Sequence, residues 1–409
     1  MKLMGNILLS LALLFCLSCE DVKEYPWNDA WNQTEQDAQD QQDPENPEEP
    51  AEPEDPDNPE TPEDPADPET PADPEDPSDP ETPEVPDNPE DPDTPEVPED
   101  PETPCDPEEP ETPAVPAGWT DVTSSFGDLP SYLRILKSPS TLQSKKAIAY
   151  VAEADMTQAQ WDVWSVRILE GKFTEQTNDT FRTPSDVYET EPFPVITNGG
   201  YFYYSGSKRY TASLAASNSE ILAYNIGYEY DDAGNTCFPV RASFLQSEDG
   251  DFDACWTYAK WDFSHYMYQI PSADPSKSPS PTYPEEGVAF DAKTAIGGGP
   301  VLINDGEFVN SYVEEMFYGI SPDTDQPRTA IGITADKRMI LFVCEGRQMT
   351  EGVAGLTTGD VAEVLLDLGC VEAINLDGGG SSCMLVNGKE TIKVCDGSQR
   401  AVASTVMLK

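Results

Sequence analysis

A long acidic, proline-rich segment limits how much of this chain can fold. Residues 41–116 contain 31 Asp or Glu and 25 Pro within 76 positions, and no Lys or Arg. Proline lacks a backbone donor, like charges repel one another, and too few apolar side chains are present to offset the conformational entropy lost on folding. We therefore predict a disordered tether over residues 19–117, followed by a folded domain over residues 118–409.

The pattern within the tether predicts an extended spacer. Pro recurs every two or three residues from Asp43 onward, which favours polyproline II. At about 3.1 Å per residue such a segment reaches up to roughly 240 Å. Acidic runs of this kind are usually solvated, and the alternative is that this one binds calcium or a cationic partner.

An export signal precedes the tether. Lys2 is followed by an apolar run, Ile7 to Leu17, whose length suits a signal peptide and is too short to cross a bilayer comfortably. Ser18 before Cys19 resembles the cleavage and acylation box of bacterial lipoproteins. We expect residues 1–18 to be removed as a lipoprotein signal peptide.

The residues after this cysteine indicate where the protein would be anchored. Cys19 would carry the lipid, and the acidic pair Glu20 and Asp21 resembles the surface-export signal of Bacteroidetes lipoproteins. The expected location is therefore the outer membrane or cell surface, with a lipid anchor as the membrane contact. Simple secretion after cleavage elsewhere is the alternative. No other stretch is long and apolar enough to predict a membrane-spanning helix.

Charge and histidine content exclude several classes of function. The formal net charge is −55, and acidity in both the tether and the domain argues against a nucleic-acid partner. The single histidine, His265, lies in a predicted loop and is expected at the surface. One histidine excludes a three-His zinc site and an H-E-x-x-H motif. Any hydrolysis should depend on carboxylates, arginine and backbone amides; no cofactor is required and no metal site is assigned.

The domain contains six cysteines: Cys237, Cys255, Cys344, Cys370, Cys383 and Cys395. An exported domain permits disulfides, but six cysteines allow 15 pairings. Proximity in sequence favours Cys237 with Cys255, and buried free thiols are the alternative.

Short runs of β-branched and aromatic residues predict an α+β fold with a β-rich core of short strands and a few packed helices. The best helix is Gly359–Leu368, with Thr358 as N-cap. Residues 235–286 are rich in Pro, Ser and aromatics and predict an insertion or loop subdomain. No break divides residues 118–409 into two domains. The predicted strands are 132–136, 147–152, 161–168, 193–197, 220–224, 288–291, 301–303, 329–333, 339–344, 373–376 and 384–386.

Five segments place glycine or polar residues directly at strand ends. They are Asn198-Gly199-Gly200-Tyr201-Phe202, the run Gly297 to Gly306, Arg328-Thr329-Ala330-Ile331-Gly332, Glu345-Gly346-Arg347, and Asn375-Leu376-Asp377-Gly378-Gly379-Gly380-Ser381-Ser382. Consecutive glycines let backbone amides point into a concavity, which suits an oxyanion. One such pair is usually a tight turn, but five at strand ends predict a site.

Taken together, these segments resemble the phosphodiester glycosidase family. The likeness runs from about Val195 to Ser382, and the segment beginning at Asn375 is its most specific part. The resemblance implies hydrolysis of the sugar C1–O bond in a sugar-1-phosphodiester of exported or surface glycans. The lead-in, residues 118–190, has no matching motif.

The resemblance, combined with physical chemistry, assigns candidate roles. Arg328 would hold the phosphate bidentately, with Arg347 as second candidate. Asp377 is the first choice for the catalytic carboxylate, followed by Glu345, with Asp360 more simply explained by its place in a helix first turn. The expected substrate-binding residues are Asn198, Gly199, Gly298, Gly299, Thr329, Arg347, Asn375, Gly378, Gly379, Gly380 and Ser381.

Structural explanations compete with these roles. Arg328 can form a salt bridge and Asp377 can cap a turn. At the level of function, the alternatives are a non-catalytic glycan-binding lipoprotein that uses Tyr201 and the following aromatics as a sugar platform, and a phosphodiesterase that cuts the P–O bond. A divalent cation near Asp377 and Glu345 is a further option.

The lipid anchor can be tested directly. Cys19→Ala removes the only thiol available at the predicted cleavage site, so the variant should leave the membrane fraction while the domain keeps its activity. Fractionation followed by immunoblotting measures this. Unchanged membrane association of Cys19→Ala would rule out the lipoprotein prediction.

Overall fold

The computed structural model describes residues 114–167, 180–205, 208–260 and 262–409. The predicted signal peptide, Cys19 and the tether up to residue 113 lie outside the described residues. Within the described part, strands dominate and two α-helices are present. The β-rich core is therefore confirmed, while the helical content is smaller than an α+β class implies. No helix in these ranges has the length and apolarity needed to span a membrane.

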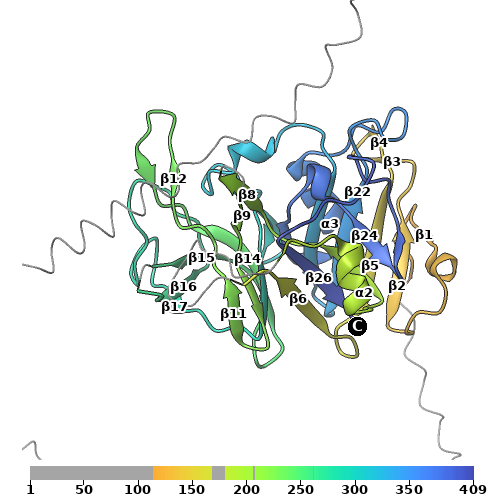
Figure 1. The fold of residues 1–409 in the computed structure, drawn as a ribbon, viewed down its shortest axis with the longest axis horizontal. Coiled ribbons are helices and arrows are strands. Elements are labelled where there is room, and N and C mark those ends of the chain that lie inside the picture. The colour runs from red at the N-terminus through yellow and green to blue at the C-terminus, as the bar shows by residue number, and fades with distance from the viewer. Residues whose placement is uncertain (1–113, 168–179, 206–207, 261) are drawn as a thin grey trace, which may run out of the picture. The chain divides into compact units, whose positions relative to one another are not determined.

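The largest sheet has eight antiparallel strands, and part of it lies at the right of Figure 1. Buried side chains of its inner strands belong to two hydrophobic clusters, one on each face. In β22, Met339 and Leu341 face one hydrophobic cluster, and Ile340 and Phe342 face another, as the period-two alternation of strand side chains requires. In order across the sheet, the strands are β1 (Thr120–Asp121), β2 (Leu133–Lys137), β5 (Ala149–Asp155), β22 (Arg338–Cys344), β21 (Arg328–Thr334), β23 (Cys370–Asn375), β19 (Val301–Asn304) and β20 (Glu307–Phe308).

Two further antiparallel sheets pack against the first. The seven-stranded sheet has the order β11 (Glu220–Ala223), β10 (Ala215–Ser217), β18 (Thr294–Gly297), β14 (Arg241–Gln246), β15 (Phe252–Ala259), β16 (His265–Tyr268) and β17 (Val288–Ala289). The five-stranded sheet has the order β25 (Lys389–Glu390), β24 (Met384–Val386), β7 (Val195–Asn198), β26 (Ser404–Leu408) and β6 (Trp161–Ser165). The main hydrophobic cluster takes residues from all three sheets, so the core lies between them.

Short hairpins and 3-10 turns complete the described elements. The hairpins are β3 (Thr141–Leu142) with β4 (Lys145–Lys146), β8 (Phe202–Ser205) with β9 (Lys208–Thr211), and β12 (Glu229–Tyr230) with β13 (Thr236–Cys237). The 3-10 turns are η1 (Thr123–Phe126), η2 (Tyr318–Ile320) and η3 (Gly379–Ser381).

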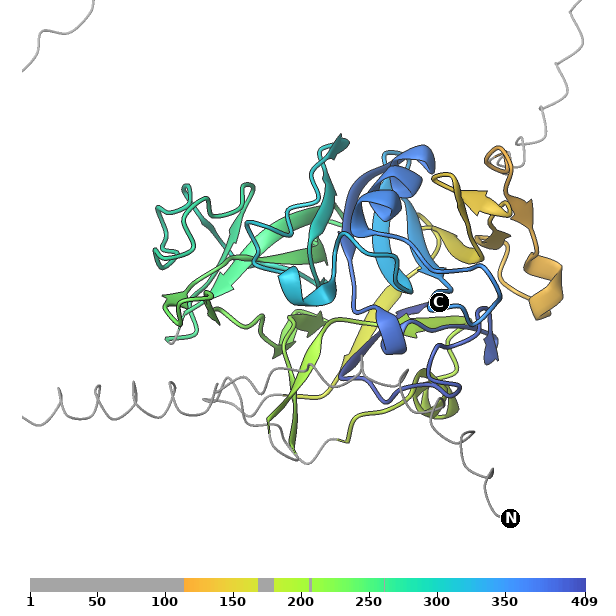
Figure 2. The same ribbon diagram turned by 90° about the horizontal axis from the view of Figure 1, so that it is seen from above.

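The two α-helices cover outer faces of the sheets, and Figure 2 shows them on opposite sides of the layered core. Helix α3 (Thr358–Asp367) packs on the eight-stranded sheet, and α2 (Pro184–Thr190) packs on the five-stranded sheet. The predicted helix is confirmed, but its N-cap is Thr357, one residue earlier than expected. Asp360 completes a capping box with Thr357, which accounts for this carboxylate structurally.

Residues 235–286 are not a loop subdomain. They contain β13, β14, β15 and β16, and β14 and β15 are interior strands of the seven-stranded sheet. Whether the segment is an insertion relative to other proteins stays a prediction. His265 also differs from expectation, because it begins β16 and is buried with its ring stacked on Phe290 at 4.3 Å. Burial lowers the pKa of His265 to about 3.

The preferred cysteine pairing was wrong. Cys237 and Cys255 are free thiols, as are the other four cysteines of the described residues. Five of the six are buried, where a thiol behaves as a small apolar side chain.

Candidate active site

Three strand ends meet at the candidate site. β7 ends at Asn198, β18 at Gly297 and β23 at Asn375, and the loops that follow them are joined by hydrogen bonds. The Asn198 side chain donates to the Asp377 carbonyl at 2.6 Å, and the Gly299 amide donates to the Asn375 carbonyl at 2.7 Å. Segments about 75 to 180 positions apart in the sequence therefore form one cluster.

The two asparagines serve this junction. Both are fully buried, at 0% exposure. Asn198 Oδ1 accepts hydrogen bonds from the Thr329 hydroxyl and the Cys383 amide. Asn375 Nδ2 donates to the Tyr201 hydroxyl and to the carbonyls of Gly299 and Leu376. These contacts hold the loops in place, and the expected part of the two residues in substrate binding stays a prediction.

The glycines at the junction are required by close approach of backbones. A Cβ on Gly298 would lie 2.3 Å from the Asn375 carbonyl oxygen, and one on Gly199 would lie 2.5 Å from Ser404 Oγ. Gly299 has φ of 146° and faces the Phe317 ring. These distances are shorter than any real Cβ contact, so the residues are glycines because larger side chains do not fit.

The glycine turn after Asp377 forms a short 3-10 turn, η3. The Gly379 amide donates to the Pro327 carbonyl, and the Ser381 amide donates to the Gly378 carbonyl. We expected the amides of this turn to bind an oxyanion. The amides of Gly379 and Ser381 are instead hydrogen-bonded within the fold. An anion bound here would therefore need donors from nearby side chains.

Asp377 lies at the start of this turn and is partly exposed. Its amide donates to the Gly199 carbonyl, so the residue is fixed between two loops. Desolvation raises the pKa of Asp377 to about 6, opposed by Ser381, Arg400 and Arg347. The Ser381 hydroxyl lies near this carboxyl without meeting hydrogen-bond geometry. A carboxyl that titrates near 6 suits acid–base chemistry at neutral pH.

Two arginines cover the glycine turn. A Cβ on Gly379 would meet Arg347 Nη2 at 2.9 Å, and one on Gly380 would overlap the Arg400 guanidinium. Arg347 is exposed, has a left-handed φ of 51°, and donates to Gln326. Arg400 is held by Asp396 through an ion pair of 2.6 Å. Both guanidiniums therefore lie close to Asp377.

Sequence reasoning missed Arg400. It follows the last predicted strand by 14 positions, and no glycine or strand-end pattern marks it. Its only local signal is the i,i+4 spacing from Asp396, which indicates an ion pair but not a location. The long loop between β25 and β26 brings it back over the glycine turn, and that contact depends on the fold.

Arg328 is a structural residue in this arrangement. It is 2% exposed, and its guanidinium donates to four backbone carbonyls: those of Ile320, Ser321, Thr324 and Leu356. One of the five N–H donors is left, so the expected bidentate phosphate contact would require at least one of these bonds to break. Arg328 borders the site, because a Cβ on Gly378 would lie 3.8 Å from its Cδ. It fixes the wall of the site rather than offering a free guanidinium to it.

Two other candidates also lie in the framework. Thr329 is fully buried, and its hydroxyl is bonded to Asn198 and Ser382. Glu345 is 4% exposed, and its Oε1 accepts from the Lys393 amide. Its Oε2 has no hydrogen-bond partner within the described ranges. No hydrogen bond among the described residues joins Glu345 to Asp377.

Tyr201 and Tyr203, in the aromatic run after Gly200, make contacts within the fold. The Tyr201 hydroxyl donates to the Gly299 carbonyl at 2.7 Å, and its ring lies 5.1 Å from Phe317. Burial, and then the charge of Asp377, raises the pKa of Tyr201. Tyr203 is buried and stacks on Tyr210. A sugar platform made of the whole run is therefore not present.

Comparisons with known proteins agree with the resemblance. Residues 265–409 match the phosphodiester glycosidase family, which confirms the predicted family over this segment. The SPbeta prophage-derived uncharacterized protein YomE of Bacillus subtilis is 38% identical over 82 residues, which is 20% of this chain and only 12% of that protein.

Two solved structures are similar at low identity. The catalytic domain of zebrafish N-acetylglucosamine-1-phosphodiester alpha-N-acetylglucosaminidase, described as auto-inhibited by its pro-peptide, is 19% identical, with 71% of this chain and 87% of that chain covered and a TM-score of 0.46. A hypothetical protein from Synechocystis is 15% identical, with 72% and 68% covered and a TM-score of 0.45.

The electrostatics of the cluster can be measured without a substrate. Asp377 should titrate near pH 6, followed by carboxyl ¹³C NMR or infrared difference spectra against Asp377→Asn. Arg400→Gln removes a cation that favours the carboxylate, so the pKa of Asp377 should rise further. Lys337→Gln is the control, since Lys337 pairs with Asp251 at the surface. Titration below pH 5, or no response to Arg400→Gln, would contradict this account.

Proposed function

We propose that this chain is a glycoside hydrolase that cleaves the sugar C1–O bond of a sugar-1-phosphodiester, taking as premise that residues 265–409 match the phosphodiester glycosidase family. The family match supports a phosphodiester glycosidase kind of activity. The bond cleaved, the residues that act and the origin of the substrate in exported or surface glycans are our proposal. The observation that carries it is a partly exposed Asp377 beside two guanidiniums on a glycine turn.

The reaction breaks the C1–O bond and joins a water oxygen to C1. The phosphate monoester leaves with the bonding electron pair, so its negative charge must be held rather than its oxygen protonated. Arg347, which lies against Gly379, and Arg400, which lies against Gly380, supply that positive charge. Fixed cations stabilise developing charge strongly where water is partly excluded.

Asp377 supplies the carboxylate that the sugar requires. With a pKa of about 6 it is ionised at neutral pH, and its charge stabilises the oxocarbenium character that develops at C1. In the same form it can take the proton of the attacking water. Activity should therefore rise with pH through about 6 and then level off, because only the ionised form performs either task.

Arg328 takes a different role in this proposal from the one its sequence context suggests. Its four hydrogen bonds to carbonyls of residues 320–324 and 356 hold the wall that faces the turn. Arg328→Lys keeps one charge but not the planar set of donors. Losses of activity should therefore be similar for charged and neutral substrates and should come with a lower melting temperature.

Isotope labelling tests which bond is cut. The substrate is an aryl sugar-1-phosphodiester or a nucleoside-diphosphate-linked sugar. Its hydrolysis in H₂¹⁸O should place the label in the released sugar, detected by mass spectrometry. Label in the phosphate would support the alternative, a phosphodiesterase. Assays with a chelator and with added Mg²⁺ or Ca²⁺ test whether a divalent cation contributes; the proposal requires none. Binding of a varied substrate panel without release of sugar would favour a glycan-binding lipoprotein.

The assignment of the phosphate contacts predicts a selective loss. Arg347→Gln and Arg400→Gln should each lower kcat/KM for a sugar-1-phosphodiester by about 10². The loss on a neutral aryl glycoside should be far smaller, because no phosphate is present to hold. Lys337→Gln is the matched control and should leave both reactions unchanged. Equal losses on the two substrates would place both arginines outside the phosphate site.

Asp377→Asn should lower kcat by at least about 10² with little change in KM, since it keeps the size of the side chain and removes its charge. The rise in activity with pH through about 6 should disappear from the residual rate. A rise that persists in Asp377→Asn would assign the titrating group to another residue.

A further inference from the structure

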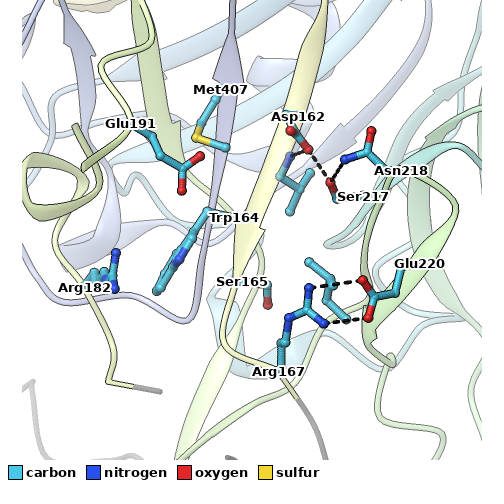
Figure 3. A pocket seen from close by; sticks show the side chains of 12 residues that line it. Asp162, Trp164, Ser165, Arg167, Arg182, Glu191, Ser217, Asn218, Glu220 and Met407 are labelled. Atoms are coloured by element: carbon cyan, nitrogen blue, oxygen red, sulfur yellow. Dashed lines mark hydrogen bonds and ion pairs between the residues drawn. The ribbon is translucent and has the colours of Figure 1, made fainter. Parts of the chain in front are cut away.

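A pocket separate from the candidate active site lies along β6, the edge strand of the five-stranded sheet. It has a volume of about 360 Å³, within the range of small-ligand sites. The strand contributes Asp162 and Trp164, and the β10–β11 hairpin contributes Ser217, Asn218 and Glu220. Figure 3 shows Trp164, Met407 and Glu191 on one side of β6 and the hairpin residues on the other. The pocket shares no lining residue with the cluster around Asp377.

One wall of the pocket combines an indole with a guanidinium. Trp164 is partly exposed, and its ring packs against the hydrophobic cluster under α2. The Arg182 guanidinium lies over this ring, 5.3 Å from its centroid, and also bonds to Thr190. These contacts fix the indole and leave a wall that is apolar in one part and a hydrogen-bond donor in another.

The opposite wall is a relay of hydrogen bonds. The Asn218 amide donates to the Ser217 hydroxyl, and this hydroxyl donates to Asp162 Oδ1 at 2.6 Å. The Val163 amide donates to the same oxygen. An ionised carboxylate accepts about four hydrogen bonds and an amide carbonyl two. Asp162 and Asn218 therefore retain acceptor capacity beside the pocket.

The charges of the lining disfavour anions. Three carboxylates, from Asp162, Glu191 and Glu220, face two guanidiniums. One of these guanidiniums, that of Arg167, is held by Glu220 in a bidentate pair at 2.6 and 3.1 Å. The Glu191 carboxylate also lines the pocket. A phosphate or nucleotide would meet a net negative wall.

Metal ions and apolar ligands fit no better. Within the described ranges no group of three or more metal-ligating side chains is placed to hold a cation. An apolar ligand would remove water from the carboxylate of Glu191 and from the remaining acceptor positions of Asp162 and Asn218, which costs free energy for each group. Hydrogen-bond acceptors beside a partly exposed indole favour a molecule with many hydroxyls and at least one apolar face.

We infer that this pocket binds a neutral saccharide at a site separate from the catalytic one. A pyranose presents hydroxyls that donate to Asp162, Glu191 and Asn218 and accept from Arg182, and its C–H groups can contact the part of the indole that Arg182 and the hydrophobic cluster leave exposed. β6 also borders the candidate active site, because its Ser165 pairs with Ser404, whose hydroxyl accepts from the Gly200 amide. The saccharide site thus lies on the strand pair that supports the catalytic loops, and it does not depend on the proposed reaction.

The probe for this site is a panel of neutral sugars: methyl glycosides of glucose, galactose, mannose and N-acetylglucosamine, and their disaccharides. Saturation-transfer NMR on the full chain should detect binding of at least one. Asn218 has a left-handed φ of 50°, so Asn218→Gly keeps the backbone geometry and removes only the amide. This variant and Asp162→Asn should each weaken binding by about fivefold or more, about the contribution of one hydrogen bond.

Asn387→Gly is the matched control, because Asn387 also has a left-handed φ, 47°, and lies in the β24–β25 turn. It should leave saccharide binding unchanged, and Asn218→Gly should leave hydrolysis of a small aryl sugar-1-phosphodiester unchanged. No binding by any member of the panel overturns the inference. Binding that survives both pocket variants but is lost in Asp377→Asn also overturns it, since the sugar then occupies the catalytic site.

Discussion

The candidate site depends on two buried side-chain amides that join separate sheets. Asn198 ends a strand of the five-stranded sheet and Asn375 ends a strand of the eight-stranded sheet. Between them they satisfy carbonyl, hydroxyl and amide groups of loops from all three sheets. A buried polar group left without a partner costs about 1–3 kcal/mol. Replacing either asparagine would therefore leave several buried groups unpaired and destabilise the loops that they join. The position of Asp377 is a consequence of this junction.

The arginines near the site differ in what surrounds their guanidiniums. Arg328 is enclosed by four carbonyls, which take four of its five N–H donors. Arg347 and Arg400 lie on glycines, where the absence of a Cβ leaves room for a planar group. The same side chain therefore stabilises the framework in one place and presents charge in another. The glycine turn contributes mainly by making space for these cations, more than by its own amides.

Much of the fold was predictable because its strands are rich in β-branched and aromatic residues, as in β22 and β6. Among the strands that were missed, β14 and β15 contain Ala, Ser, Cys and Asp beside their aromatics, which weakens the pattern that identifies a strand. Within the candidate site, the sequence predicted that the loops after β7, β18 and β23 come together, and hydrogen bonds join them. It could not separate Arg328 from Arg400, because burial among carbonyls and return of a distant loop are tertiary properties.

The pairing of β26 has a consequence for the order in which the protein can mature. This strand lies between β7 and β6 in the five-stranded sheet, although roughly 200 residues of chain separate its partners from it. During synthesis, β6 and β7 emerge long before the strand that joins them. The amides of Gly199 and Gly200 both donate to Ser404. This loop therefore cannot make these two hydrogen bonds until Ser404 has emerged. A chain that has not yet emerged as far as Ser404 therefore lacks the contacts that hold the candidate site together.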